Sequence, residues 1–468
     1  MQSYTQAFDP HVALAEMSRP GYGIQHSGDD EISIAIDRAA RQLGWHDQDA
    51  RPLGNIIPRG AKVLVKPNLV LHENRAPHGI EPLVTHPSLI RAVVDAALKS
   101  GAGEVLVGDA PIQSCDFDHL LSATELDRWA EELMGREPRF KGVRDFRRTT
   151  CALKNGVRVA SENLQPEDRF ALFDLGQNSL LEPITDDRGS FRVTCYDPRL
   201  MARTHAPGRH QYLVAREVIE ADVIINLPKL KTHKKAGLTC ALKNLIGING
   251  NKEYLPHHRV GGSETGGDCY AGSSLLKRTI EYIADQQNRT VSLAAGRLWK
   301  GLTVPLYQMM RLTKESPDTE GAWSGNDTIW RTCLDLNRIL LYGRADLRLD
   351  KEIQRRVIHI ADAVIAGQGE GPLAPEPLPL GLILAGQTAA AVDYVGAHLL
   401  GYDPARIPIV DRAFNQSGWP LTSFTQDEVA LVGDWGSGAA CELLRRKEPL
   451  CSVAHPTGWR DTANGSIS

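Results

Sequence analysis

The sequence predicts an α/β protein in which mostly parallel, open sheets are covered by helices. Two observations support this fold class. Short Val-, Leu- and Ile-rich runs alternate with segments of 3.6-residue periodicity, and Gly or Pro flanks many of these runs. Strands that are buried on both faces have continuous apolar sequences of this kind. The 468 residues are enough for one large domain or for two domains with separate cores.

The composition is that of an ordinary globular protein, with 42% apolar and 24% charged residues. The formal net charge of −4 creates no overall field that would attract nucleic acid or an acidic membrane. The first residues lack a signal-peptide pattern and no run of eighteen apolar residues occurs, so we expect a cytoplasmic protein without an integral membrane segment. The eight cysteines form no C-x-x-C pair, so we expect reduced thiols and no iron–sulfur cluster.

The expected elements follow one another along the chain. Residues 61–134 contain an apolar run, a helical segment and a second apolar run, which predict a right-handed βαβ unit. Residues 135–220 are rich in Arg and Asp with short apolar runs, which favours an inserted, partly β region. Residues 221–260 form a second, basic α/β unit. Residues 261–330 are Gly-rich and then helical, which indicates a lid or subdomain, and residues 331–455 resume the strand–helix alternation.

The two ends of the chain have weaker patterns. Residues 1–60 are expected to form an N-terminal extension, and residues 456–468 a disordered tail. Pro305 is expected to interrupt the amphipathic stretch at 296–313, which argues against a membrane anchor there. Further candidate strands cover residues 169–176, 221–228, 357–367, 380–386 and 429–434.

Polar residues follow four of the expected strands at their carboxyl ends, where open parallel sheets bind their ligands. A turn is the ordinary explanation for any one of them, because Gly, Asp, Asn and Pro are common turn formers. Their shared position after apolar strands predicts that they meet in one pocket. These residues are Lys66, Asn68, Asp109, Lys229, Asp362 and Glu370.

A basic segment follows the strand that ends near Leu227. From Val223 to Lys252 the chain contains no acid and six lysines. Residues 237–247 read as an amphipathic helix, with the lysine-rich loop leading into its N-terminus, where backbone N–H groups favour an anion. A solvated basic loop is the alternative interpretation. The segment therefore favours binding of a phosphate or carboxylate.

These residues indicate an enzyme that acts on a small anionic substrate by acid/base or metal-assisted chemistry. The expected catalytic residues are His233, Lys229, Lys66 and Asp109. The expected substrate-binding residues are Lys231, Lys243, Asn244, Asn68 and Thr239. The expected ligands of a divalent metal, whose identity the sequence leaves open, are Asp362, Glu370, His257 and His258.

Imidazole titrates near neutrality, and the neighbouring lysines are expected to depress the pKa of His233. The chain lacks the P-loop and G-x-S-x-G motifs, and Pro372 follows a partial G-x-G pattern where a dinucleotide-binding helix would begin. We therefore expect neither NAD nor FAD.

Two other functions stay open. The basic segment would bind nucleic acid only weakly because Tyr254 is the one aromatic residue near it, so no nucleic-acid partner is expected. The protein could instead be a non-catalytic binding protein for a metal, a cofactor or a partner, with residues 296–313 as the partner face. The substrate, the reaction and the oligomeric state are not determined by the sequence.

Several motifs together resemble a known family. They include KPN at 66–68, GDAP at 108–111, PKLKTH at 228–233, AGLTCALKN at 236–244 and GEGP at 369–372. In this order, between residues 61 and 410, they resemble the widespread prokaryotic family called domain of unknown function 362. The resemblance implies an α/β fold, enzymatic activity and a bacterial source, and leaves the reaction open. Many members of this family carry ferredoxin-like cysteine clusters, which this chain lacks. A more distant similarity to nickel-dependent lactate racemase-like proteins rests on the Lys/His-rich segment and assigns no ligand.

Overall fold

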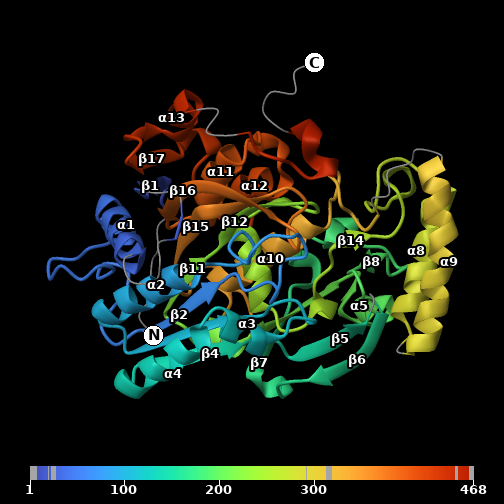
Figure 1. Ribbon diagram of the computed structural model, residues 1–468, viewed down its shortest axis with the longest axis horizontal. Coiled ribbons are helices and arrows are strands. Elements are labelled where there is room, and N and C mark those ends of the chain that lie inside the picture. The colour runs from blue at the N-terminus through green and yellow to red at the C-terminus, as the bar shows by residue number, and fades with distance from the viewer. Residues whose placement is uncertain are drawn as a thin grey trace.

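The computed structural model describes residues 8–18, 21–22, 28–154, 157–290, 292–312, 319–447 and 452–462. Its centre is an eleven-stranded sheet (Figure 1). In order across the sheet, nine of these strands are β18 (Gly438–Ala439), β17 (Ala430–Gly433), β1 (His11–Glu16), β16 (Glu376–Gly386), β15 (Arg356–Gln368), β11 (Val223–Leu227), β2 (Lys62–Pro67), β3 (Glu104–Asp109) and β4 (Phe140–Asp145). The other two are β12 (Lys229–His233), which pairs with β15, and β13 (Gly237–Thr239), which pairs with β12.

Parallel pairing connects β15, β11, β2, β3 and β4, and it also connects β12 with β15 and β1 with β17. The pairs β15–β16, β1–β16, β12–β13 and β17–β18 are antiparallel. The sheet is therefore mixed and mostly parallel, which confirms the predicted fold class. The carboxyl ends of β2, β3 and β11 meet at one edge, because these strands are neighbours and run in the same direction.

Helices cover both faces of the sheet and divide its side chains between two cores. Val63 and Val65 of β2 lie in one core, whereas Leu64 lies in the other, because successive strand residues point to opposite faces. The first core contains α1 (Gly28–Gln42), α2 (Pro87–Lys99), α3 (Phe117–Ala123) and α4 (Leu126–Arg136). The second contains α7 (Ala241–Asn244), α10 (Ile329–Tyr342), α11 (Ala389–Leu399), α12 (Pro408–Asp411) and α13 (Ala440–Lys447).

The inserted region after β4 is partly β, as predicted. Its strands form a hairpin, a three-stranded sheet and a short pair. These are β5 (Thr149–Lys154) with β6 (Val157–Asn163); β7 (Phe170–Asp174) with β10 (Arg209–Ala215) and β9 (His205–Ala206); and β8 (Phe191–Arg192) with β14 (His258–Arg259). Its helices are α5 (Pro198–Thr204) and α6 (Arg216–Glu220).

A helical hairpin stands at the edge of the molecule (Figure 1). It consists of α8 (Leu275–Asn288) and α9 (Leu293–Leu312) and supplies the expected helical part of residues 261–330. The sequence predicted an interruption at Pro305, but α9 continues through this residue as one helix and packs against α8. Within the described residues, no helix is both long enough and apolar enough to cross a membrane.

Both terminal segments contribute to the folded body. The segment expected as an extension supplies β1 between β16 and β17, because the apolar residues 12–15 are buried on both faces of the sheet. The expectation of disorder is wrong for residues 456–462. Residues 457–462 form a 3₁₀ turn in which the indole N–H of Trp459 donates to the Lys234 carbonyl over 2.7 Å. Residues 463–468 of the expected tail lie outside the described part of the chain.

Candidate active site

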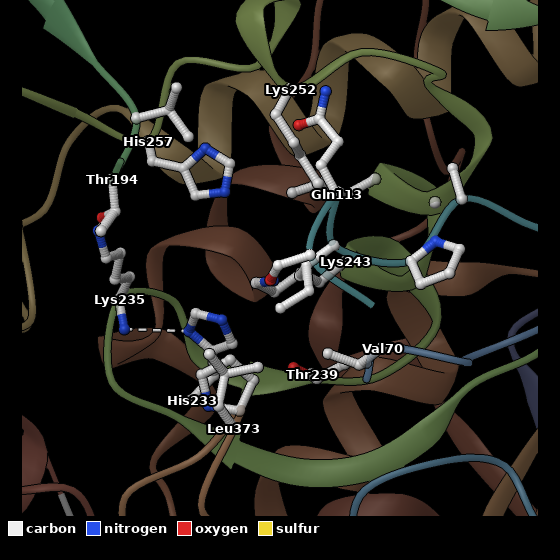
Figure 2. Close-up of a pocket in the computed structure, with 18 of the residues that line it drawn as sticks. Val70, Gln113, Thr194, His233, Lys235, Thr239, Lys243, Lys252, His257 and Leu373 are labelled. Carbon is white, nitrogen blue, oxygen red and sulfur yellow. Dashed lines mark hydrogen bonds between the residues drawn. The ribbon is translucent and has the colours of Figure 1, made fainter. Parts of the chain in front are cut away.

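A cavity of about 300 Å³ lies between the carboxyl ends of β2 and β3 and the segment from β12 to α7 (Figure 2). Loops from the inserted region, the residues before α10 and the loop after β15 complete its wall. The residues that the sequence predicted and that line this cavity are Asn68, Asp109, Lys231, His233, Thr239, Lys243, Asn244 and His257. The structure therefore brings together side chains that are far apart in the sequence.

The basic segment forms the floor of the cavity with a hairpin rather than a helix. The pairing of β12 with β13 places Lys231 opposite Thr239 and His233 opposite Gly237. The turn needs a positive φ of 80° at Gly237, which glycine adopts without strain. The single helix predicted for residues 237–247 is wrong: β13 comes first, and α7 is one turn long. Pairing with β12 overrides the helical periodicity of this stretch.

The start of α7 already binds an acidic side chain of the protein. The backbone N–H groups of Ala241 and Leu242 donate to Asp393 over 2.6 and 3.2 Å. Burial raises the pKa of Asp393 to about 7. The predicted anion site at this N-terminus is therefore filled by Asp393, and the positive charge of the cavity comes from side chains.

Lys66 and Asp109 form a buried ion pair behind the cavity wall. The Lys66 Nζ donates to Asp109 Oδ1 over 2.7 Å and to Asn244 Oδ1 over 3.1 Å. Burial lowers the pKa of Lys66, and the Asp109 charge opposes this effect. The other Asp109 oxygen accepts the backbone N–H of Leu69 over 2.7 Å. Lys66 therefore supports the wall from behind, while Asp109 and Asn244 line the cavity.

Lys229 and Asp362 form a second buried ion pair away from the cavity, 2.8 Å between Nζ and Oδ2. Tyr22 donates to Asp362 Oδ1 over 2.5 Å and accepts from the Lys229 Nζ over 2.7 Å. Neither member of this pair lines the cavity. The register of β12 against β15 shifts between Lys229 and Lys231, and this irregularity separates the two lysines.

Four lysines line the cavity, and burial lowers the pKa of each: Lys231, Lys235, Lys243 and Lys252. The charges of neighbouring lysines lower all four further, but on Lys235 the Glu320 charge acts more strongly and raises the pKa. For Lys252 the charge of Lys243 acts most strongly after burial, and its pKa falls to about 8. Lys235 donates to Thr194 Oγ1 over 3.0 Å, and Lys231 donates to the Leu83 carbonyl. Among the described residues, none of the four is within ion-pair distance of a carboxylate.

Two histidines present opposite hydrogen-bonding groups to the cavity. His233 Nδ1 accepts the backbone N–H groups of Lys235 (dashed in Figure 2) and Ala236 over 3.0 and 3.2 Å. In the neutral ring the proton is therefore on Nε2, which can donate. His257 Nδ1 lies 2.6 Å from the Leu255 carbonyl and must donate, so its Nε2 has the lone pair. Burial and nearby lysines hold the pKa of both rings well below the ordinary value, so both are neutral at pH 7.

Three buried polar atoms in the lining have no hydrogen-bond partner among the described residues: Asn68 Oδ1, Gln113 Oε1 and Thr239 Oγ1. The orientation of the Gln113 amide is fixed, because its Nε2 donates to Asn251 Oδ1, an oxygen that accepts the Glu253 N–H. Buried polar groups in native proteins are nearly always hydrogen-bonded. Because three such atoms lie in one cavity, they indicate a ligand that supplies the missing hydrogen bonds.

The four expected metal ligands do not come together. His257 lines the cavity, His258 belongs to β14, and Asp362 is paired with Lys229. Glu370 accepts the backbone N–H and the hydroxyl of Thr457 over 2.9 and 3.1 Å. In the part of the chain that the structure describes, no three His, Cys, Asp or Glu side chains are placed to hold a metal ion.

Sequence reasoning did not assign a role to several lining residues. Lys235 and Lys252 belong to the acid-free run, and this run was the signal that could have identified them. Gln113, Thr194 and Glu320 carried no such signal, because they lie in a loop, in the inserted region and before α10.

Two solved structures show weak overall similarity to this chain. A Thermotoga maritima protein is 12% identical, with 78% of this chain aligned and a TM-score of 0.32. The lactate racemase apoprotein from Thermoanaerobacterium thermosaccharolyticum is 11% identical, with 85% of this chain aligned and a TM-score of 0.31. This chain spans 57% of the length of each.

A thylakoid-associated protein of Synechocystis is 23% identical over 360 residues, which cover 76% of this chain and 68% of that protein. The model of the family described as domain of unknown function 362 matches residues 63–164 and 181–398, which contain most of β2, all of β3, the basic segment and most of α11. The chain therefore belongs to the family domain of unknown function 362.

Proposed function

We propose that the protein is an enzyme that binds a small phosphate- or carboxylate-bearing substrate in this cavity and transfers a proton to or from it. The observation that carries this proposal is the group of cavity lysines without a carboxylate partner among the described residues. Burying an ammonium group without a compensating charge is costly. An anionic substrate supplies the compensating charge, so the lysines favour its binding.

The unsatisfied polar atoms indicate a second property of the substrate. Asn68 Oδ1 and Gln113 Oε1 are acceptors and need N–H or O–H donors, which phosphate dianions and carboxylates lack. A substrate that carries a hydroxyl or amino group beside its anionic group, or that gains one during the reaction, satisfies both sets of partners.

The two histidines provide the acid/base chemistry. His257 Nε2 is the base, because its lone pair is free to accept a proton, and the His233 Nε2–H stabilises negative charge that develops on the substrate. A bound anion raises the pKa of both rings by favouring their charged forms. The four residues that the sequence predicted as metal ligands lie apart, and the proposed proton transfer is assigned to the two histidines.

The test has two stages. Phosphate, sulfate and small hydroxylated carboxylates and phosphates are screened for stabilisation against heat, with chloride at equal ionic strength as the reference. We expect several of these anions to raise the melting temperature, because ligands that bind the folded state stabilise it. Lys243→Met should reduce the effect at least tenfold in apparent affinity. Lys62→Met, which changes an exposed lysine at the start of β2, should leave it unchanged.

Stabilising compounds are then incubated with the protein in D₂O, and exchange of carbon-bound hydrogen is followed by NMR. We expect exchange in at least one compound, and His257→Gln should abolish exchange while the compound still stabilises the variant. If no anion stabilises the protein, or if Lys62→Met weakens binding as much as Lys243→Met, the proposed function is wrong.

A further inference from the structure

We propose that Lys252 forms an imine with the carbonyl group of its substrate, so that the substrate is a small aldehyde or ketone bearing a carboxylate or phosphate. This inference rests on the proposed function, because the other cavity lysines must first bind the anionic group. It assigns a covalent role to one side chain and a chemical class to the ligand.

The backbone of Lys252 is fixed at the cavity wall. It begins a 3₁₀ turn, Lys252–Tyr254, which Asn251 caps by accepting the Glu253 N–H over 3.0 Å. The N–H of Leu255 donates to the Lys252 carbonyl over 3.0 Å and closes the turn. The residue is 8% exposed and lines the cavity. A short, closed turn of this kind holds its side chain in a defined direction.

Lys252 differs from most lysines of this region in the hydrogen bonding of its amine. The amines of Lys66, Lys231 and Lys235 all donate hydrogen bonds within the protein. Among the described residues, Lys252 has neither a carboxylate nor a hydrogen-bond acceptor at Nζ. Lys243 shares this property, and we assign it to the anionic group of the substrate, because it reaches the cavity from α7 beside Asn244.

The surroundings make this amine a nucleophile near neutral pH. Burial and the Lys243 charge lower the pKa of Lys252 to about 8. With this pKa, roughly one amine in ten is unprotonated at pH 7, whereas an exposed lysine is almost fully protonated. A neutral lysine amine is the form that attacks carbonyl groups.

His257 lies in the cavity wall and serves as the acid/base group of imine formation. His257 Nε2 takes a proton from the Lys252 ammonium, and the Nζ lone pair then forms a bond to the carbonyl carbon. The carbonyl oxygen takes up the second proton from Nζ and becomes the hydroxyl of a carbinolamine. Protonated His257 returns its proton to that hydroxyl, the C–O bond breaks, and water leaves a protonated imine. Ammonium and carbonyl thus give iminium and water with no net change in protons.

Gln113 completes this arrangement. Its amide is tied to Asn251, the neighbour of Lys252, by a 3.3 Å hydrogen bond from Nε2. Its Oε1 has no donor among the described residues. The iminium N–H and the carbinolamine hydroxyl are donors that form only during the reaction, so an unsatisfied acceptor at this position stabilises them selectively.

The experiment traps the imine by reduction. The full-length protein is incubated with pyruvate or glyceraldehyde 3-phosphate and sodium cyanoborohydride, and the modified lysine is located by peptide mass spectrometry. We expect one adduct per chain, on Lys252, and at least tenfold less labelling in excess sulfate, which competes for the anion site. Lactate, which has the same charge as pyruvate but no carbonyl group, should give no adduct. The exposed lysines Lys62 and Lys99 are internal controls.

Lys252→Arg keeps the positive charge but cannot form an imine, so it should lose the adduct and still be stabilised by sulfate. Labelling on Lys243 instead, or unspecific labelling of exposed lysines, would overturn the assignment. Absence of an adduct in a protein that sulfate stabilises would refute the imine and leave the proposed function intact. Absence of both the adduct and the stabilisation would refute the proposed function as well.

Discussion

Lysines with depressed pKa values determine the chemistry of the cavity at the scale of single residues. Lys231 is 0% and Lys252 8% exposed, and burial is the main cause of the lower pKa of both. Charged groups in such positions reduce the stability of the protein without ligand. The cavity therefore stores unfavourable electrostatic energy that an anion relieves on binding.

Replacement of Lys252 by Met should stabilise the protein in the absence of ligand. The pKa of Lys252 is about 8 in the folded protein and 10.5 ordinarily, a difference worth about 3 kcal/mol. Below pH 8 both the folded and the unfolded state are protonated, so the full penalty applies. Between pH 8 and 10.5 the unfolded state binds more protons, so stability rises with pH. Urea unfolding at pH 7 should show Lys252→Met to be more stable than the wild type by up to this amount.

The advantage of the variant should shrink as the pH rises from 8 towards 10.5, because the wild type loses its penalty there. Lys62→Met, at an exposed position, serves as the control and should change stability by less than about 0.5 kcal/mol. A variant that is less stable than the wild type at pH 7 would show that Lys252 is not electrostatically penalised.

At the scale of elements, the 3₁₀ turn after α7 approaches the ion pair behind the cavity. A Cβ atom at Gly247 would lie 2.0 Å from Asp109 Oδ1 and 2.6 Å from Lys66 Nζ. The Gly247 carbonyl also accepts the N–H of Ala110 over 2.8 Å. Only glycine allows the turn and the carboxyl end of β3 to approach this closely.

Gly247→Ala should therefore destabilise the protein by about 1–3 kcal/mol through overpacking. It should also weaken anion binding, because Asp109 lines the cavity and must move. Thermal unfolding with and without sulfate measures both effects. Gly79→Ala is the matched control, since a Cβ there has no neighbour within 4 Å. Equal stability of the two variants would contradict the close packing at Gly247.

The sequence predicted the strands of the central sheet better than it predicted the basic segment. The apolar runs that become β2, β3, β11 and β15 are buried on both faces, so their sequences identify them. The stretch at 237–247 has apolar residues at helical spacing, yet its first part pairs with β12. Spacing within a short stretch cannot reveal a partner strand, nor the shift in β12 that separates Lys229 from Lys231.

The sequence predicted only part of the candidate site. Adjacent parallel strands bring their carboxyl ends together, so Asn68 and Asp109 could be placed at one edge from the sequence. The sequence predicted Lys229 and Asp362 in the same pocket, but they pair with each other and do not line the cavity. Gln113 could not be predicted, because its importance arises from one unsatisfied oxygen that only the folded chain defines.

At the scale of the whole molecule, the cavity is a product of distant segments. The sheet edge supplies Asp109, the inserted region Thr194, and the residues before α10 Glu320. The Lys235 amine donates to the Thr194 hydroxyl, which in turn donates to Glu320 over 2.9 Å. This chain of hydrogen bonds connects the basic segment to the two regions that cover it. The burial that depresses the lysine pKa values therefore depends on the complete fold.

The most direct test of anion binding by this buried lysine group is calorimetric titration of the wild-type protein with sulfate at pH 8, in two buffers of different ionisation enthalpy. Sulfate has no titratable proton at this pH, so any proton that is taken up comes to the protein. Because Lys252 is about half protonated at pH 8 and a bound anion raises its pKa, we predict binding with net proton uptake. Absence of sulfate binding, or binding without proton uptake, would contradict the proposal that the buried lysines form an anion site.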